Sequence, residues 1–139
     1  MRAVLDTNVL VAARRSRGGA SNALLRAADA RAFVMIASVP LFFEYEAVLT
    51  RPEHLAVLGL TERMVAEFLD HLAAVIEPVS LSYLWRPQLI DVGDEMVLET
   101  AINGRADTIV TFNIRHFGPA RRFGISLLRP EEAMRSLRG

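Results

Sequence analysis

The chain has 139 residues, with 16 basic and 16 acidic side chains and no net formal charge. This length is typical of one domain with a real hydrophobic core, so we expect a single domain over residues 1–139. The absence of cysteine excludes disulfides and thiolate metal sites. The absence of lysine excludes chemistry that needs a lysine as a phosphate anchor or Schiff base, whereas arginine, which supplies every basic residue, can still bind phosphates.

The start of the chain has no long apolar segment. Asp6 follows only three apolar residues, Ala3 to Leu5, which is too short for a signal-peptide core or a membrane span. The lack of cysteine fits a reducing compartment. We therefore expect a cytoplasmic protein that is not associated with a membrane.

Short apolar runs alternate with helical patterns in the first half of the chain. Ser38 before Pro40, and Thr61 before Glu62, are typical helix starts. The predicted elements are a strand at 3–5, a short helix at 9–14, a helix capped by Ser21, a strand at 33–36, a helix from 38 to about 49 that ends at Arg51-Pro52, and a helix from 61 to 74.

The same alternation continues to the end of the chain. We expect strands at 76–79, 108–111 and 125–128, a helix at 91–103 closed by Gly104, and a last helix that begins at Pro130. Short, fully apolar strands between amphipathic helices indicate a parallel sheet covered on both faces. The predicted fold class is therefore α/β, a three-layer α/β/α domain with a central parallel sheet of about five strands.

Several oxygen-bearing side chains are expected at one edge of this sheet, because ligands bind beyond the carboxyl ends of parallel strands. Asp6 follows the first strand, and Thr111 and Asn113 follow the fourth. Asp94 begins a helix, and Glu44 lies in an otherwise apolar helical stretch. Carboxylates without lysine or cysteine are typical ligands of Mg²⁺ or Mn²⁺, and phosphodiester hydrolysis is the natural chemistry of such a site.

Each of these acids also has a structural interpretation. Asp6 is a suitable turn former or helix cap, and a buried Glu44 needs a partner that is either a cation or an arginine. Asp91 is three residues before Asp94, which is a capping pattern. We interpret Asp91 as the cap and Asp94 as a metal ligand, and we expect Glu99 to lie outside the site.

Four segments in this order resemble the PIN-domain family, and the resemblance covers essentially the whole chain. They are residues 4–10 (VLDTNVL), 40–52 (PLFFEYEAVLTRP), 91–101 (DVGDEMVLETA) and 106–113 (ADTIVTFN). The resemblance implies metal ligands at Asp6, Glu44, Asp94 and Asn113, and catalytic residues at these four positions and at Thr111, which matches a hydroxyl often kept near the metal. Many members have Asp where this chain has Asn113, so the resemblance also implies weaker binding of a second ion.

The family's activity is metal-dependent cleavage of RNA. The resemblance implies an endoribonuclease that uses Mg²⁺ (or Mn²⁺), and for a short stand-alone chain it implies a VapC-like toxin of a bacterial toxin–antitoxin pair. A cognate antitoxin and a homodimer are the expected protein partners. The alternative is a degenerate PIN domain that binds RNA or a protein without cleaving, and Asn113 favours it.

Arginines near the first and fourth segments are candidates for binding the RNA backbone. The alternative interpretation is ordinary solvated loop residues. Tyr83 and Trp85 are candidates for stacking on a base or for simple packing, and His116 is the one histidine near the fourth segment. The RNA-binding candidates are Arg14, Arg15, Arg17 and Arg115, with Arg121 and Arg122 further along.

Other phosphate enzymes on similar sheets fit less well. A haloacid-dehalogenase-like phosphatase has a second Asp where this chain has Asn8, and both it and a phospho-receiver need a lysine. A P-loop NTPase needs a glycine-rich Lys-Ser/Thr motif. The sequence contains neither a lysine nor that motif.

Overall fold

Short parallel strands alternate with helices in the computed structural model, which describes residues 1–82, 89 and 91–139. In chain order the elements are β1 (Arg2–Leu5), α1 (Thr7–Arg15), α2 (Ala20–Asp29), β2 (Val34–Ser38), α3 (Val39–Leu49), α4 (Pro52–Leu58), α5 (Glu62–Val75), β3 (Glu77–Val79), α6 (Val92–Asn103), β4 (Thr108–Val110), the 3-10 helix η1 (Ile114–Phe123), β5 (Ser126–Leu128) and α7 (Pro130–Arg138). The predicted alternation is confirmed.

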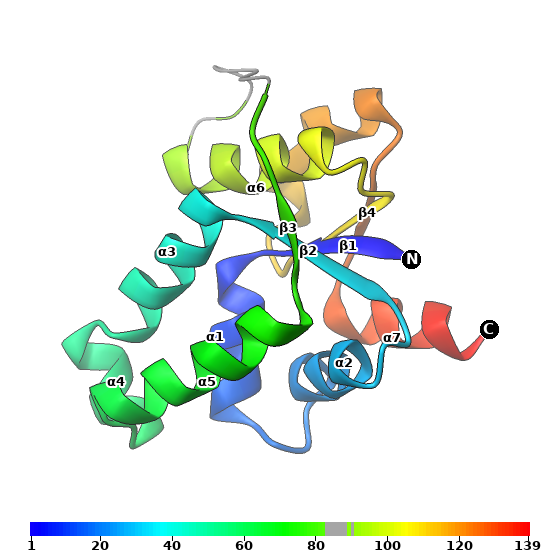
Figure 1. Ribbon diagram of the computed structural model, residues 1–139. Helices are drawn as coiled ribbons and strands as arrows, with labels where there is room; N and C mark the ends of the chain where they lie inside the picture. Colours follow the sequence, from blue (N-terminus) through cyan, green and yellow to red (C-terminus); the bar gives the residue numbers. More distant parts are fainter. Residues whose placement is uncertain (83–88, 90) are drawn as a thin grey trace.

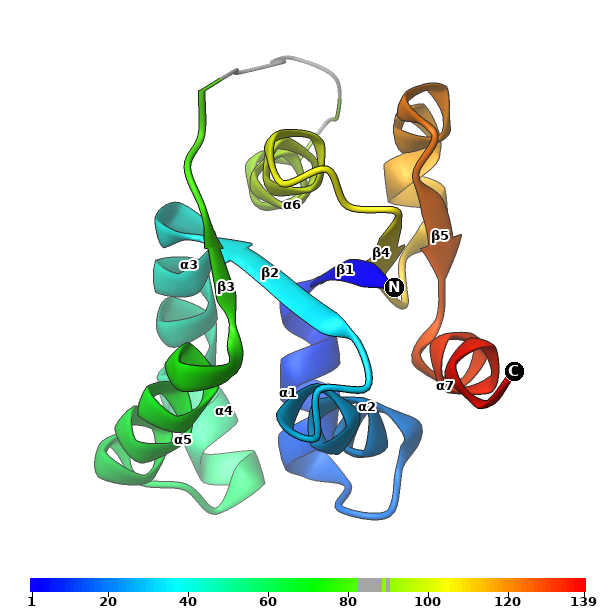
Figure 2. The same cartoon turned by 45° about the vertical axis from the view of Figure 1, so that its right-hand side comes forward.

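The strands form one parallel sheet in the order β3-β2-β1-β4-β5. In Figures 1 and 2, α6 lies over one face of this sheet, and α1, α2 and α7 lie over the other. The prediction of a three-layer α/β/α fold with five parallel strands is therefore confirmed. Strand β1 is central, and its register pairs Leu5 with Val110 of β4.

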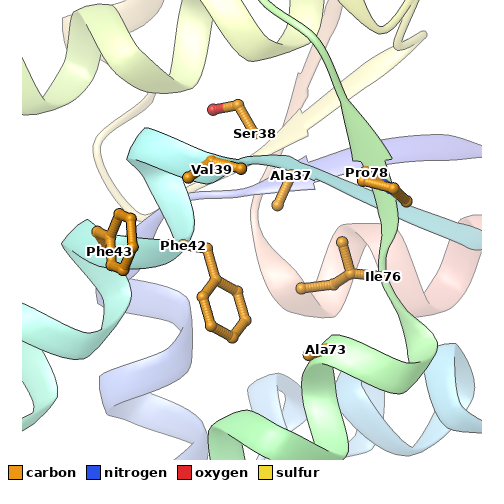
Figure 3. Close-up of a pocket in the computed structure, with 8 residues that line it drawn as sticks. All are labelled: Ala37, Ser38, Val39, Phe42, Phe43, Ala73, Ile76 and Pro78. Carbon is orange, nitrogen blue, oxygen red and sulfur yellow. The ribbon is translucent and has the colours of Figure 1, made fainter.

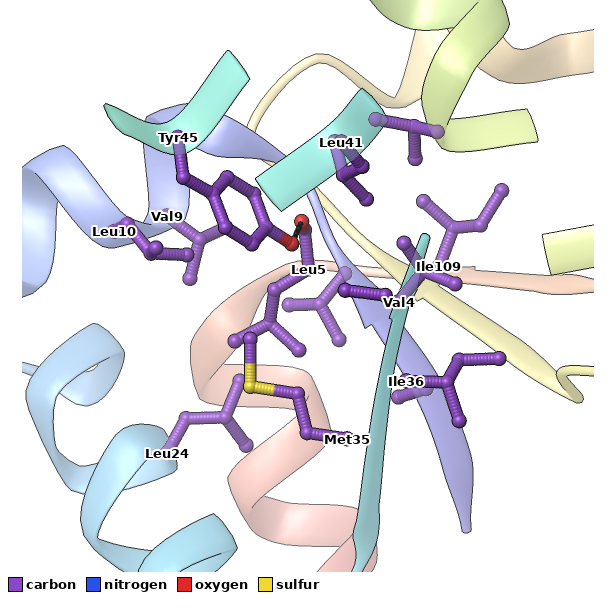
Figure 4. Close-up of a cluster of buried hydrophobic side chains, with 14 of the residues drawn as sticks. Val4, Leu5, Val9, Leu10, Leu24, Met35, Ile36, Leu41, Tyr45 and Ile109 are labelled. Carbon is purple, nitrogen blue, oxygen red and sulfur yellow. Dashed lines mark hydrogen bonds between the residues drawn. The ribbon is translucent and has the colours of Figure 1, made fainter. Parts of the chain in front are cut away.

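The core is built around β1, because helices cover both faces of this strand. Val4 and Leu5 have no exposed surface, and Leu10 of α1 packs in the same buried cluster (Figure 4). Each such side chain contributes about 1.5–3 kcal/mol on burial. The fully buried Tyr45 of α3 donates its hydroxyl to the Leu5 carbonyl at 2.5 Å, and burial raises the pKa of that hydroxyl. This bond holds α3 against the end of β1, one residue before Asp6.

Three features of the helices differ from expectation. Ser21 is not a cap, because α2 begins at Ala20 and Ser21 is buried in its first turn. Pro52 does not only end a helix; it also begins α4, whose seven residues are too few for its apolar side chains to show a helical period. The helix η1 contains Pro119, normally a helix breaker, and was also not expected. No helix in the described part of the chain is long and apolar enough to cross a membrane.

Candidate active site

Asp6 and Thr111 meet at the carboxyl ends of two neighbouring strands. Because Leu5 pairs with Val110, the next residue of each strand emerges at the same edge of the sheet. The Thr111 hydroxyl donates to Oδ2 of Asp6 at 2.7 Å, and the backbone N–H of Thr7 donates to Oδ1 at 2.8 Å. Asp6 is only 7% exposed, so both carboxylate oxygens are held in place before any ligand binds.

The buried Thr111 hydroxyl also connects the fourth strand to the helix that follows. It accepts a hydrogen bond of 2.9 Å from the backbone N–H of Asn113, which is the residue before η1. The Asn113 side chain itself is exposed. Thr111 therefore orients Asp6 and sets the path of the chain at Asn113.

The first turn of α6 brings two more carboxylates to this region. Oδ1 of Asp91 accepts the backbone N–H of Asp94 at 3.0 Å, which confirms Asp91 as the helix cap. Glu44 of α3 reaches the same turn, because a Cβ atom added at Gly93 would lie 3.9 Å from Oε1 of Glu44 and 3.0 Å from Oδ1 of Asp91. A glycine at position 93 therefore keeps room between these two acids.

The proton affinities of Asp6 and Asp94 show that the carboxylates act on one another. Burial raises the pKa of Asp94 to about 6, with further contributions from the negative charges of Asp6 and Asp91. Burial also raises the pKa of Asp6, although its hydrogen bonds from Thr111 and Thr7 oppose the shift. Asp91 therefore contributes its charge to the site as well as capping α6.

His116 of η1 approaches the site from the side of β4. Its Nδ1 lies 3.4 Å from Oδ2 of Asp94, and its side chain is 57% exposed. The histidine lowers the pKa of both Asp94 and Asp6, opposing the effect of burial. His116, the histidine near the fourth PIN-like segment of the sequence, therefore lies beside Asp94.

The donor types fit a hard divalent cation, since carboxylate oxygens come from Asp6, Asp94 and Glu44. Two of these acids have pKa values raised by burial first and by neighbouring negative charges second, and a bound cation would favour their ionised forms. Among the described residues, no three His, Asp or Glu side chains lie close enough together to hold one ion. The structure therefore joins Thr111 to Asp6 and places Glu44 by the first turn of α6, whereas it shows no contact of the Asn113 side chain with these acids.

The candidate arginines are placed in different surroundings. The guanidinium of Arg14 lies over the Phe68 ring, 4.8 Å from its centroid. Arg15 is exposed and lines a hollow together with Thr7, whereas Arg17 and Arg115 are exposed outside the hollows described here. Tyr83 and Trp85, the candidates for base stacking, lie outside the described residues.

Helix α6 carries two buried acids that the sequence analysis did not assign to the site. Glu95 is 3% exposed and accepts a hydrogen bond from the backbone N–H of Leu89, and Glu99 has no exposed surface. Glu99 was expected outside the site, and the structure places it in the packed face of α6. Their four-residue spacing, which puts both on one helix face, is the signal that could have identified them.

The family model for the PIN domain matches residues 2–115. The chain belongs to the PIN-domain family. A solved structure of VapBC2 from Rickettsia felis, bound to a DNA fragment from its promoter, contains a chain with the same fold: the TM-score is 0.63 at 19% identity, over 93% of this PIN domain and 98% of that chain. No match to this PIN domain is found among curated proteins.

Proposed function

We propose that this PIN domain is an endoribonuclease that cleaves RNA phosphodiester bonds with Mg²⁺ (or Mn²⁺). The observation that carries the proposal is that Asp6, held by Thr111 at the carboxyl end of β1, lies near enough to Asp94 of α6 for its negative charge to help raise the Asp94 pKa. Burial raises the pKa of both acids, and carboxylates with raised pKa values are typical of functional sites. A divalent cation with a phosphodiester is the ligand chemistry that suits oxygen donors in a PIN domain.

The proposed metal ligands are Asp6, Glu44, Asp94 and Asn113. A bound ion would lower the pKa of a water and neutralise charge on the phosphate during hydrolysis. The chain's own residues prepare the site: Thr111 holds Asp6 in one orientation, and Asp91 fixes the first turn of α6 and thereby Asp94. His116, 3.4 Å from Asp94, restrains that carboxylate from the other side. Asn113 supplies an uncharged oxygen, which favours a single ion over a pair.

The exposed residues Arg15, Arg17 and Arg115 are proposed to bind the RNA backbone. Arg14 was predicted with them, but its guanidinium packs on Phe68, so the proposal relies on the other three.

An apolar surface that includes the start of α3 supports the proposal that this PIN domain has a protein partner. Val39 and Phe43 are 62% and 61% exposed beside a hollow of about 170 Å³ that Phe42 and Ile76 line, at the sheet edge formed by β3 (Figure 3). Exposed apolar patches of this kind mark protein interaction sites. We propose that a cognate antitoxin or a second copy of the chain covers it, in line with the VapBC2 complex of similar fold, and that the protein is a cytoplasmic toxin of a toxin–antitoxin pair.

The second candidate is a PIN domain that binds RNA or a protein without cleaving. The presence of Asn113 favours it, because the site loses one negative charge that would hold a metal. The retention of Asp6, Glu44 and Asp94 favours the nuclease.

The test is cleavage of structured and single-stranded RNA by the purified protein with Mg²⁺, Mn²⁺ or EDTA. Asp6→Asn and Asp94→Asn are expected to abolish metal-dependent cutting, and Asp70→Asn, an exposed acid on α5, is the matched control that retains it. Full activity in a folded Asp94→Asn variant would refute the assignment of that residue. If no RNA is cut, Mn²⁺ calorimetry separates the two candidates, since heat of binding without cutting indicates a substrate not yet sampled, and absence of binding indicates the non-cleaving module.

A further inference from the structure

A second hollow, of about 500 Å³, is lined in part by the residues that directly follow Asp6 and Thr111 in the chain. Thr7 and Asn8 line it, and they follow Asp6 in the chain; Phe112 also lines it and follows Thr111. The same two strand ends that present the acids therefore also form one wall of this hollow. We propose that it binds a phosphodiester group and its nucleotide, next to the bond that is cut, so that it is a subsite for the RNA strand. This inference rests on the proposed function.

The charge of the hollow is of one sign. Arg15 at the end of α1, Arg51 at the start of α4 and His54 in the first turn of α4 line it, and no Asp or Glu is among the described residues that do so. Within the described part of the chain, neither Arg15 nor Arg51 forms an ion pair with an acid. Two guanidinium groups that line one cavity without an acidic partner are suited to binding an anion there.

The ring of His54 is fixed in one orientation. Its Nδ1 lies 2.6 Å from the carbonyl of Val48, and because a carbonyl only accepts, Nδ1 carries the hydrogen. The backbone N–H groups of His54 and Leu55 in turn donate to the carbonyl of Arg51, which sets the first turn of α4. The short helix that the sequence did not predict thus holds Arg51 and His54 beside α1.

The remaining features favour a nucleotide over a small anion. A cavity of about 500 Å³ lies within the range of roughly 300–1,000 Å³ that small-molecule sites occupy. Phe112 offers an aromatic side chain, on which a base of any identity can stack. Position is the strongest argument, since Thr7 and Phe112 directly follow Asp6 and Thr111, so that an RNA strand bound in this hollow would lie near Asp6. An acidic protein segment could pair with Arg15 and Arg51, but it would not require an aromatic side chain at Phe112 or a nearby catalytic carboxylate.

The experiment measures binding of a fluorescein-labelled single-stranded RNA by anisotropy in EDTA, where a metal-dependent nuclease does not cut. Arg51→Gln and Arg15→Gln are each expected to weaken binding about tenfold and to lower the slope of log affinity against log salt by about 0.7. Arg31→Gln is the matched control, because Arg31 lies in the turn before β2, at the opposite end of the sheet from Asp6. Thermal melts establish that each variant is folded.

Competition identifies the ligand and separates this inference from the proposed function. Unlabelled RNA should displace the probe at far lower concentration than inorganic phosphate or a polyglutamate peptide. The subsite would be overturned, even if the protein cleaves RNA, if wild type, Arg15→Gln and Arg51→Gln bound RNA equally well. It would also be overturned if these two substitutions weakened binding of the polyglutamate peptide but not of RNA. Arginine-dependent RNA binding by a protein that cuts no RNA and binds no Mn²⁺ would support the subsite and contradict the nuclease.

Discussion

Asp94→Asn is expected to make the metal-free protein more stable at neutral pH while removing its activity. Burial and the charges of Asp6 and Asp91 raise the pKa of Asp94 to about 6, about two pH units above its usual 3.8. Each pH unit corresponds to about 1.4 kcal/mol, so the ionised carboxylate costs at most about 3 kcal/mol. The Asp94 side chain is 14% exposed, and water screens part of this cost. We therefore expect Asp94→Asn to raise the free energy of unfolding by about 1–2 kcal/mol.

The pH dependence has a definite sign. Above pH 6 Asp94 is ionised in the folded and unfolded states, and the folded state carries the full electrostatic cost. As the pH falls from 6 to 4, the folded protein takes up the proton first, and most of the cost is lost. The advantage of Asp94→Asn should therefore be complete at pH 8 and mostly lost by pH 4.

Urea unfolding in EDTA at pH 8, 6 and 4 measures this difference, with Asp70→Asn as the control for an exposed acid. The expected gain corresponds to a rise in Tm on the order of 5 °C. A variant that is no more stable than wild type at pH 8, or whose advantage does not change between pH 8 and pH 4, would refute the placement of Asp94 beside Asp6 and Asp91.

Three further predictions concern the metal and the packing. Saturating Mn²⁺ should raise the Tm of wild type by several degrees and that of Asp94→Asn by less, because a ligand of the folded state is lost; equal shifts in a thermal melt would contradict this. Gly104→Ala should lower the free energy of unfolding by about 1–3 kcal/mol in urea, since the new Cβ would lie 2.5 Å from Cδ1 of Ile36. Tyr45→Phe removes the buried hydrogen bond to the Leu5 carbonyl and should cost about 1–2 kcal/mol in the same assay, whereas no loss would mean that another donor replaces the hydroxyl.

Much of the candidate site was predictable because its residues stand next to strand ends. Asp6 and Thr111 each follow a short apolar run, and a parallel sheet brings such positions to one edge whatever the loops between them do. The cap at Asp91 was also predictable, since it depends on a contact three residues away. The approach of Glu44 to Gly93 was not, because it depends on how α3 packs against α6.

The sequence by itself determined the alternation of strands and helices, because hydrophobic periodicity and capping act between residues close in the chain. It also determined which oxygen donors follow β1 and β4. Only the tertiary structure decided that α4, too short to show a helical period, and its N-cap Arg51 lie beside Thr7 and Phe112, so that Arg51 and His54 line the same hollow. Only the fold likewise raised the pKa of Asp94, because burial and the charges of residues distant in sequence exist only after the chain has packed.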